Sequence, residues 1–222
     1  MIKVCPSSNP CPEKNLIEYI KTLENYGVEY LHCDVMDGKF VENSCLDYNT
    51  LENARNNTNI LLDIHLMVED VYANVIKFSK LKPSIITIHY EALKNTHEFD
   101  KVRNYLKHQQ ILMGLAIKPN TPVEIVSRLI NKVDLVLIMT VEPGKSGQKL
   151  ITDTLTKVQL VRDLTHENGT IIEVDGGINE DNYSQVIKCG GQFLVMGSAF
   201  YNSTDRPKLL HSIDKHYKNN SH

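Results

Sequence analysis

The segment Leu31-His32-Cys33-Asp34 has two counterparts later in the chain, Asp63-Ile64-His65-Leu66-Met67 and Glu173-Val174-Asp175-Gly176-Gly177. All three combine residues typical of β-strands with side chains that bind metals. Residues two apart in a strand lie on the same face, so His32 and Asp34 point the same way. The same parity holds for Asp63 and His65, and for Glu173 and Asp175. A fold that brings the ends of these three strands together would therefore place histidine and aspartate side chains close to one another.

The rest of the chain repeats this strand character at regular intervals. Eight runs rich in Val, Ile, Leu, Thr or Tyr are predicted to be strands, at about 2–7, 29–36, 60–68, 84–90, 111–117, 134–141, 170–175 and 192–197. Helix-compatible segments fill the gaps. The clearest are 12–26, which stops at Gly27, a segment that starts with Thr121 as N-cap and Pro122 at the first helical position, and the segments 152–167 and 180–188.

Strands that alternate with helices predict an α/β fold, a (β/α)₈ TIM barrel, as one domain over residues 1–222 with a frayed tail at 218–222. A doubly wound open sheet is the competing architecture. It would need a glycine-rich turn after the first strand, where this chain has Pro6-Ser7-Ser8-Asn9-Pro10.

Composition excludes several classes of protein. The chain has 222 residues and a net charge of −3, which argues against nucleic acid as a partner. No apolar run approaches the roughly 18 residues of a membrane span, and the start of the sequence reads as a strand rather than a signal peptide. The five cysteines form no CxxC pair, so we expect reduced thiols and a cytoplasmic protein.

Four of the strand-end residues form a candidate metal site: His32, Asp34, His65 and Asp175. A single strand histidine is more often a hydrogen-bonded core residue. Four such groups at one end of three strands would be costly to bury without a partner, and a cation removes that cost. Mixed imidazole and carboxylate ligation suits Zn²⁺ or a neighbouring first-row metal and leaves room for substrate oxygens.

Glycines at three neighbouring strand ends form a second constellation. Gly144-Lys145-Ser146-Gly147 follows the sixth predicted strand, Gly176-Gly177 the seventh and Gly197-Ser198 the eighth. Tight turns from strand to helix need glycine in any case. In barrels, however, the loops after the last two strands commonly bind phosphate through backbone amides, so the coincidence predicts an anion site.

Longer motifs resemble one known family. They are His32-Cys33-Asp34-Val35-Met36-Asp37-Gly38-Lys39-Phe40-Val41, His65-Leu66-Met67-Val68, Gly114-Leu115-Ala116-Ile117-Lys118-Pro119-Asn120-Thr121-Pro122, Met139-Thr140-Val141-Glu142-Pro143-Gly144 and Val174-Asp175-Gly176-Gly177-Ile178. In this order, from Lys3 to about Tyr201, the chain resembles the ribulose-phosphate 3-epimerase family. The resemblance implies a ribulose-phosphate-binding barrel that interconverts D-ribulose 5-phosphate and D-xylulose 5-phosphate in the pentose phosphate pathway.

The resemblance also implies roles for individual residues. The metal ligands would be His32, Asp34, His65 and Asp175, and two of them, Asp34 and Asp175, would be the acid/base pair. The substrate would be held by Ser7, His65, Gly144, Lys145, Ser146, Gly147, Asp175, Gly176, Gly177, Gly197 and Ser198. The site would be lined by Met36, Met67 and Met139. His89 and Glu91 match a family pattern, and Asp63 and Glu173 lie one layer below the ligands, so these four are candidates to support the site.

The reaction explains why two carboxylates are needed. Inverting C3 of a ketose phosphate requires removal of the proton α to the C2 carbonyl. One carboxylate takes that proton from one face, and the other returns a proton to the opposite face. One divalent ion stabilises the enediolate as a Lewis acid; Zn²⁺ or Fe²⁺ is expected, with Mn²⁺ and Co²⁺ left open. The family further implies a homo-oligomer, a dimer or a hexamer.

Three alternatives stay open at this stage. Val41-Glu42-Asn43 and the loop Gly144-Lys145-Ser146-Gly147 depart from the family pattern, which leaves the size of the substrate undecided. The chain could therefore be a hexulose 6-phosphate 3-epimerase, acting for example on D-allulose 6-phosphate. It could also be a sugar-phosphate-binding barrel without activity. Lys145 either reaches the phosphate or points to water.

Overall fold

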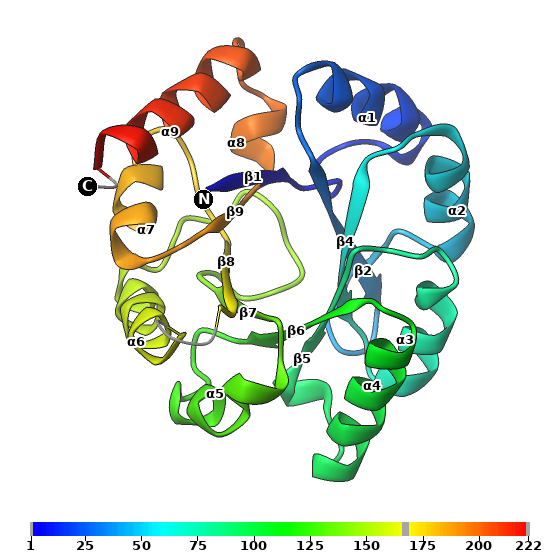
Figure 1. The fold of residues 1–222 in the computed structure, drawn as a ribbon. Helices are drawn as coiled ribbons and strands as arrows, with labels where there is room; N and C mark the ends of the chain where they lie inside the picture. The colour runs from blue at the N-terminus through cyan, green and yellow to red at the C-terminus, as the bar shows by residue number, and fades with distance from the viewer. Residues whose placement is uncertain (1, 166–168, 221–222) are drawn as a thin grey trace.

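Eight parallel strands surrounded by helices form the computed structural model, which describes residues 2–165 and 169–220 (Figure 1). The parallel strands are β1 (Lys3–Pro6), β2 (Tyr30–Asp37), β4 (Leu61–Met67), β5 (Ile85–His89), β6 (Leu112–Ile117), β7 (Leu135–Met139), β8 (Ile171–Asp175) and β9 (Phe193–Met196). Each coincides with a run that the sequence predicts to be a strand, with β2 extending one residue beyond the predicted 29–36, so the TIM-barrel prediction is confirmed. The short strand β3 (Ser44–Cys45) was not predicted; it pairs antiparallel with the end of β2.

The barrel closes between its first and second strands. The hydrogen-bonded order runs from β1 through β9, β8, β7, β6, β5 and β4 to β2, and a parallel bridge joins Ser7 to His32. The backbone N–H of Ser8 donates to the carbonyl of His32 over 2.9 Å. Closure therefore brings the end of β1 directly beside the first predicted metal ligand.

The outer ring is helical. Its α-helices are α1 (Leu16–Asn25), α2 (Tyr48–Asn57), α3 (Val71–Ser79), α4 (Thr96–His108), α5 (Glu124–Leu129), α6 (Leu155–Thr165), α7 (Tyr183–Cys189), α8 (Ser198–Tyr201) and α9 (Arg206–Asn220), with 3₁₀ turns at Glu13–Asn15, Tyr90–Ala92, Ile130–Lys132 and Thr152–Thr154. Gly27 follows α1 with a φ of +74°, as its predicted place after a helix end requires. None of these helices is long and apolar enough to cross a membrane.

One predicted helix start is wrong, and two further predictions extend beyond the described residues. Thr121 does not cap a helix: α5 begins at Glu124, and the Thr121 hydroxyl donates to Glu91 instead. In the predicted tail, α9 continues to Asn220, where Lys218 pairs with Asp214 one turn earlier over 2.6 Å, and residues 221–222 lie outside the described residues. The helix predicted to end at Glu167 is α6, which ends at Thr165, and Glu167 lies outside the described residues.

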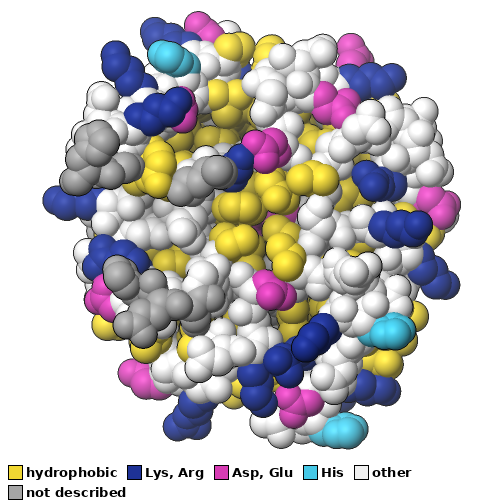
Figure 2. All heavy atoms as spheres, in the orientation of Figure 1, with side chains coloured by type: hydrophobic (Ala, Val, Ile, Leu, Met, Phe, Trp, Pro, Cys, Tyr) yellow, Lys and Arg dark blue, Asp and Glu magenta, His cyan; other side chains and the backbone are white. Residues whose placement is uncertain are grey.

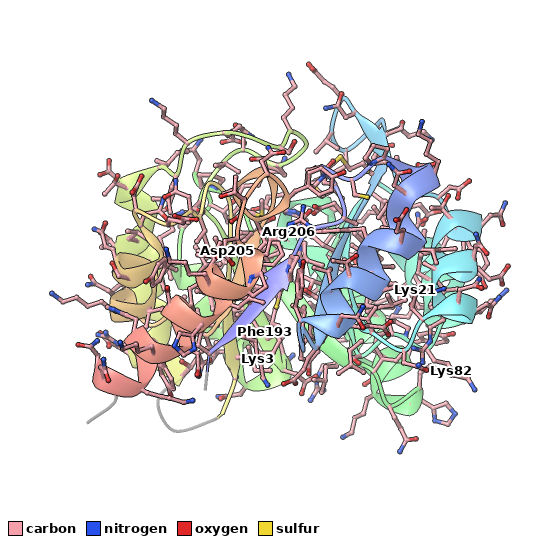
Figure 3. The ribbon with its side chains drawn as sticks, turned by 90° about the horizontal axis from the view of Figure 1, so that it is seen from above. Lys3, Lys21, Lys82, Phe193, Asp205 and Arg206 are labelled. Atoms are coloured by element: carbon pink, nitrogen blue, oxygen red, sulfur yellow. The ribbon has the colours of Figure 1, made fainter. Side chains whose placement is uncertain are left out.

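The barrel interior is apolar at the amino ends of the strands. A cluster that includes Cys5, Leu135 and Phe193 fills it, and the rings of Tyr30 and Phe193 lie 5.0 Å apart. Figure 2 shows this end of the molecule, with hydrophobic side chains gathered at its centre. Figure 3 gives the side view, in which Lys3 and Phe193 mark the same end. Polar side chains are thus left to converge at the opposite end, where the strands finish.

Candidate active site

A cavity of about 370 Å³ opens at the carboxyl ends of the barrel strands, a volume within the usual range of small-molecule sites. Its lining includes all but two of the predicted site residues: Ser7, Asp34, Met36, Met67, Met139, Gly144, Lys145, Ser146, Gly147, Asp175, Gly176, Gly177, Gly197 and Ser198. The other two, His32 and His65, are fully buried in the barrel wall beside it.

Strand register brings the four candidate metal ligands together. In the parallel pair of β2 and β4, His32 lies opposite Asp63, and Asp34 lies opposite His65. Asp175 comes from the end of β8. One potential ligand atom from each of His32, Asp34, His65 and Asp175 lies within 4.8 Å of the other three. This donor set of two imidazoles and two carboxylates fits a divalent first-row metal.

His32 is oriented by the carboxylate beside it. Its Nδ1 lies 2.6 Å from Asp63 Oδ2, so Nε2 faces the cluster, 3.3 Å from His65 Nδ1. A carboxylate behind a ligating histidine is a common arrangement at metal sites. Burial opposes protonation of His32, but Asp63 and Asp34 outweigh it and raise the pKa of His32 well above its usual value.

The two aspartates have contrasting environments. Asp34 accepts a hydrogen bond from Ser7 Oγ over 2.8 Å and lies 3.2 Å from His65 Nδ1. Burial opposes its ionisation, but the histidines around it outweigh burial and lower the pKa of Asp34. Burial and the charge of Asp34 raise the pKa of Asp175 to about 6. Asp34 is thus kept in its basic, ionised form, whereas Asp175 holds a proton more readily.

A chain of side chains leads away from His65. Its Nε2 lies 2.9 Å from His89 Nε2, and His89 Nδ1 lies 3.0 Å from Glu91 Oε2. Burial lowers the pKa of His89 to about 4, so this imidazole is neutral. Burial also opposes ionisation of Glu91, but the hydrogen bond from His89 outweighs it, and the pKa of Glu91 falls to about 2. Glu91 is therefore a carboxylate near neutral pH.

Glu173 lies one layer below the ligands. It is fully buried, and its Oε1 lies 3.6 Å from His32 Nδ1. Burial and the neighbouring Asp63 raise the pKa of Glu173 well above the usual value. Asp63 thus contacts His32 at hydrogen-bond distance, whereas Glu173 is a second carboxyl group, farther from the same nitrogen.

The three glycine segments lie against one another at the rim of the cavity. A Cβ on Gly177 would come within 2.3 Å of the backbone nitrogen of Leu150, so the loops after β7 and β8 are in backbone contact. A Cβ on Gly147 would lie 4.0 Å from Ser198 Oγ, at the start of α8. Their conformation also demands glycine, since φ is +69° at Gly177 and +77° at Gly147. The three segments thus bring backbone from three strand ends to one side of the cavity, as the predicted anion site requires.

Several residues that line the cavity were not predicted from the sequence. Asn9, Gln148, Asn179 and Asn202 line it. Gln148 Nε2 donates to the carbonyls of Glu142 and Lys145 over 2.7 and 2.9 Å and so ties the loop after β7 into its shape. Asn9 lies two residues beyond Ser7, a proximity that could have identified it. The contacts of Gln148 follow only from the folded loop.

Comparison with protein families and with known sequences finds matches over nearly the whole chain. The chain matches a model described as the ribulose-phosphate 3 epimerase family over residues 3–201. A ribulose-phosphate 3-epimerase of Bacillus subtilis is 38% identical over 216 residues, covering 96% of this chain and 98% of the relative. One from Helicobacter pylori is 36% identical, covering 96% of each chain, and a chloroplastic one from Arabidopsis thaliana is 34% identical, covering 96% of this chain and 76% of the relative.

Solved structures support the fold. A 3-hexulose-6-phosphate synthase superposes with a TM-score of 0.73 at 12% identity, covering 96% of this chain and 99% of the other. A thiamine phosphate pyrophosphorylase from Pyrococcus furiosus superposes with a TM-score of 0.65 at 15% identity, covering 98% and 96%. At such low identity these likenesses concern architecture alone.

Proposed function

The chain belongs to the ribulose-phosphate 3-epimerase family, and we propose that it inverts C3 of its substrate with one divalent metal ion and two opposed carboxylates, Asp34 and Asp175. The enzyme epimerises D-ribulose 5-phosphate to D-xylulose 5-phosphate. The observation that carries the proposed mechanism is the convergence of His32, Asp34, His65 and Asp175 beside a cavity rimmed by glycine loops. A barrel that only bound sugar phosphates would have no use for two carboxylates of opposite acid–base character.

The roles of the aspartates follow from their surroundings. Asp34, whose pKa is lowered, is the base that takes the C3 proton of ribulose 5-phosphate. Asp175, whose pKa is raised to about 6, is the acid that returns a proton from the other face. In the reverse direction the two exchange roles. Ser7 keeps the carboxylate of Asp34 oriented by its hydrogen bond to Oδ2.

The glycine cradle anchors the other end of the substrate. Backbone amides at Gly144–Gly147, Gly176–Gly177 and Gly197–Ser198 are proposed to bind the phosphate. Lys145 and Ser146 belong to the same loop, and His65 completes the proposed substrate contacts. Met36, Met67 and Met139 line the site and exclude water from the reacting carbons.

His32, Asp34, His65 and Asp175 would hold the metal, with Zn²⁺ or Fe²⁺ preferred over Mn²⁺ and Co²⁺. When bound, a divalent ion supplies Lewis-acid stabilisation of the negative charge that develops on the sugar oxygens. A homo-oligomer, dimeric or hexameric, is part of the proposal and is tested by light scattering of the purified protein. The five free thiols support a reducing compartment such as the cytoplasm.

Purified protein, treated with chelator and reloaded with a single metal, tests the proposal. We expect turnover of ribulose 5-phosphate with a kcat/KM far above that for allulose 6-phosphate, loss of activity with chelator and recovery with Zn²⁺ or Fe²⁺. A higher kcat/KM for allulose 6-phosphate would favour the hexulose phosphate alternative. Turnover of neither substrate by metal-loaded protein would favour a binding barrel.

A further inference from the structure

The chain of side chains behind His65 has no part in the chemistry proposed above. His65 and His89 are both fully buried, and their Nε2 atoms face each other at 2.9 Å. The ring of Phe40 packs against His89 with a centroid distance of 4.9 Å, and Lys118 Nζ lies 4.2 Å from the centroid of Phe40. Water is thereby kept from the contact between the two histidines.

Glu91 holds the outer end of this chain. Its Oε1 accepts from the backbone N–H of Lys118 over 2.8 Å and from the hydroxyl of Thr121, while its Oε2 faces His89. The loop that carries these donors is fixed from α6, where Lys157 Nζ donates to the carbonyls of Lys118, Pro119 and Thr121. Lys118 and Thr121 thus supply two donors to Oε1, as suits a carboxylate, and Oε2 is left to accept from His89.

The carboxylate sets the direction of every hydrogen bond in the chain. Because Glu91 accepts, His89 must carry its proton on Nδ1 and leave a lone pair on Nε2. That lone pair can only accept, so His65 must carry its proton on Nε2. The other ring nitrogen of His65, Nδ1, faces the ligand cluster, 3.2 Å from Asp34 Oδ1 and 3.3 Å from His32 Nε2, so Nδ1 is the nitrogen offered to a metal ion.

We propose that Glu91 is a positioning residue that acts through His89 to fix the tautomer and ring orientation of His65 and so sets the affinity of the site for a divalent ion. The inference rests on the proposed function, in which His65 is a metal ligand. Partners behind the ligands commonly change metal affinity about 10- to 100-fold when removed.

Replacing Glu91 by glutamine reverses the direction of the hydrogen bonds that link residue 91 to His89 and His89 to His65. Lys118 N–H and the Thr121 hydroxyl require an acceptor, so the amide oxygen of Gln takes the place of Oε1 and its NH₂ group faces His89. His89 must then accept at Nδ1 and carry its proton on Nε2, which forces the proton of His65 onto Nδ1. A nitrogen that carries a proton cannot bind a metal, so Glu91→Gln weakens binding although it barely changes shape.

Two measurements test this. The first uses wild-type, metal-free protein with ¹⁵N-labelled histidine: long-range ¹H–¹⁵N spectra at neutral pH should show a proton on Nε2 of His65, and on His89 a proton on Nδ1 with none on Nε2. In Glu91→Gln both should be reversed. The opposite tautomers in wild type would overturn the inference, and this part needs no variant to fold.

The second measurement is the affinity for Co²⁺, followed by its visible absorption and by competition with a chelator. Glu91→Gln should bind Co²⁺ about 10- to 100-fold more weakly than wild type. Glu69→Gln is the matched control, because it removes an exposed charge at the same rim, beside Lys39 and Asp70, without touching His89. Its affinity should equal that of wild type.

These measurements distinguish a failure of the positioning role of Glu91 from a failure of the proposed metal-dependent function. If wild type binds Co²⁺ and turns over ribulose 5-phosphate while Glu91→Gln binds Co²⁺ equally tightly, Glu91 has no positioning role and the proposed function stands. If wild type binds no Co²⁺, the metal-dependent function fails, and the inference fails with it. Equal weakening in Glu69→Gln would also overturn the inference, because it would assign the effect to charge at the rim.

Discussion

Asp34 and Asp175 bring carboxylate oxygens to within 4.8 Å of each other, yet their surroundings shift their pKa values in opposite directions. Asp34 accepts a hydrogen bond from Ser7 and lies against two imidazoles. The ionised form of Asp175, by contrast, is disfavoured by burial and by the charge of Asp34. Opposite pKa shifts of this kind allow one aspartate to act as a base and the other as an acid.

Removal of either carboxylate should therefore stop epimerisation. Asp34→Asn and Asp175→Asn keep the shape of the side chain but can neither take nor return the C3 proton, so each should lower kcat by about 10²- to 10⁴-fold. The assay is conversion of ribulose 5-phosphate by protein whose metal content has been measured. A variant that keeps full metal occupancy and more than a tenth of the wild-type kcat would show that its aspartate is not the acid or base.

Burial of a neutral His89 should make stability depend on pH. Its pKa is about 4 in the folded protein and about 6.5 when unfolded, so the unfolded state binds more protons between these values. The stability that wild type gains from His89 is complete above pH 6.5 and is lost as the pH falls towards 4. Urea unfolding with chelator present, for wild type and His89→Gln, should show a stability difference that shrinks between pH 7 and pH 5. A difference independent of pH would show that His89 is not buried in its neutral form.

The strands, and the convergence of His32, Asp34, His65 and Asp175, could be predicted from the sequence because both depend on a local period. His32 and Asp34 alternate with buried apolar residues, and that parity alone aims them into the barrel. Contacts between residues far apart in the sequence could not be predicted from a local period. The hydroxyl of Thr121 looks like a helix cap in sequence, but the loop instead turns it onto Glu91, thirty residues earlier. Likewise, the polar tail at Lys218 is helical because one face of α9, with Leu209 and Ile213, is buried.

The cradle glycines should tolerate alanine less well than other glycines of similar conformation. Gly27 and Gly177 have φ values of +74° and +69°, but a Cβ on Gly27 meets nothing within 4 Å, whereas one on Gly177 meets backbone atoms of the loop after β7. Gly27→Ala should cost about 1–2 kcal/mol of stability and leave KM unchanged. Gly177→Ala should cost more and raise KM, because the two loops must separate. Thermal unfolding and steady-state kinetics measure both, and an unchanged KM in Gly177→Ala would remove this loop from the phosphate site.

Lys145 offers a test of electrostatic assistance to phosphate binding. Its side chain lies at the rim of the cavity, largely exposed, with Nζ 3.7 Å from Glu42. An exposed pair of this kind contributes little to stability, so the ammonium is free to face an incoming phosphate. Lys145→Ala should raise KM a few-fold at low ionic strength, and the difference should shrink in high salt as charges are screened. Glu42→Gln is the control and should not raise KM. An unchanged KM in Lys145→Ala at low salt would mean that the backbone amides bind the phosphate without it.

The fate of the C3 hydrogen tests the two-carboxylate account most directly. Wild-type enzyme is given ribulose 5-phosphate in ²H₂O, and the label at C3 is read by NMR at low conversion. If one aspartate removes the proton and the other delivers a different one from the opposite face, the xylulose 5-phosphate formed carries deuterium at C3 from the first turnovers, while unreacted substrate keeps protium. Product that retains the C3 protium of the substrate would contradict the account, because the same hydrogen would then have left and returned.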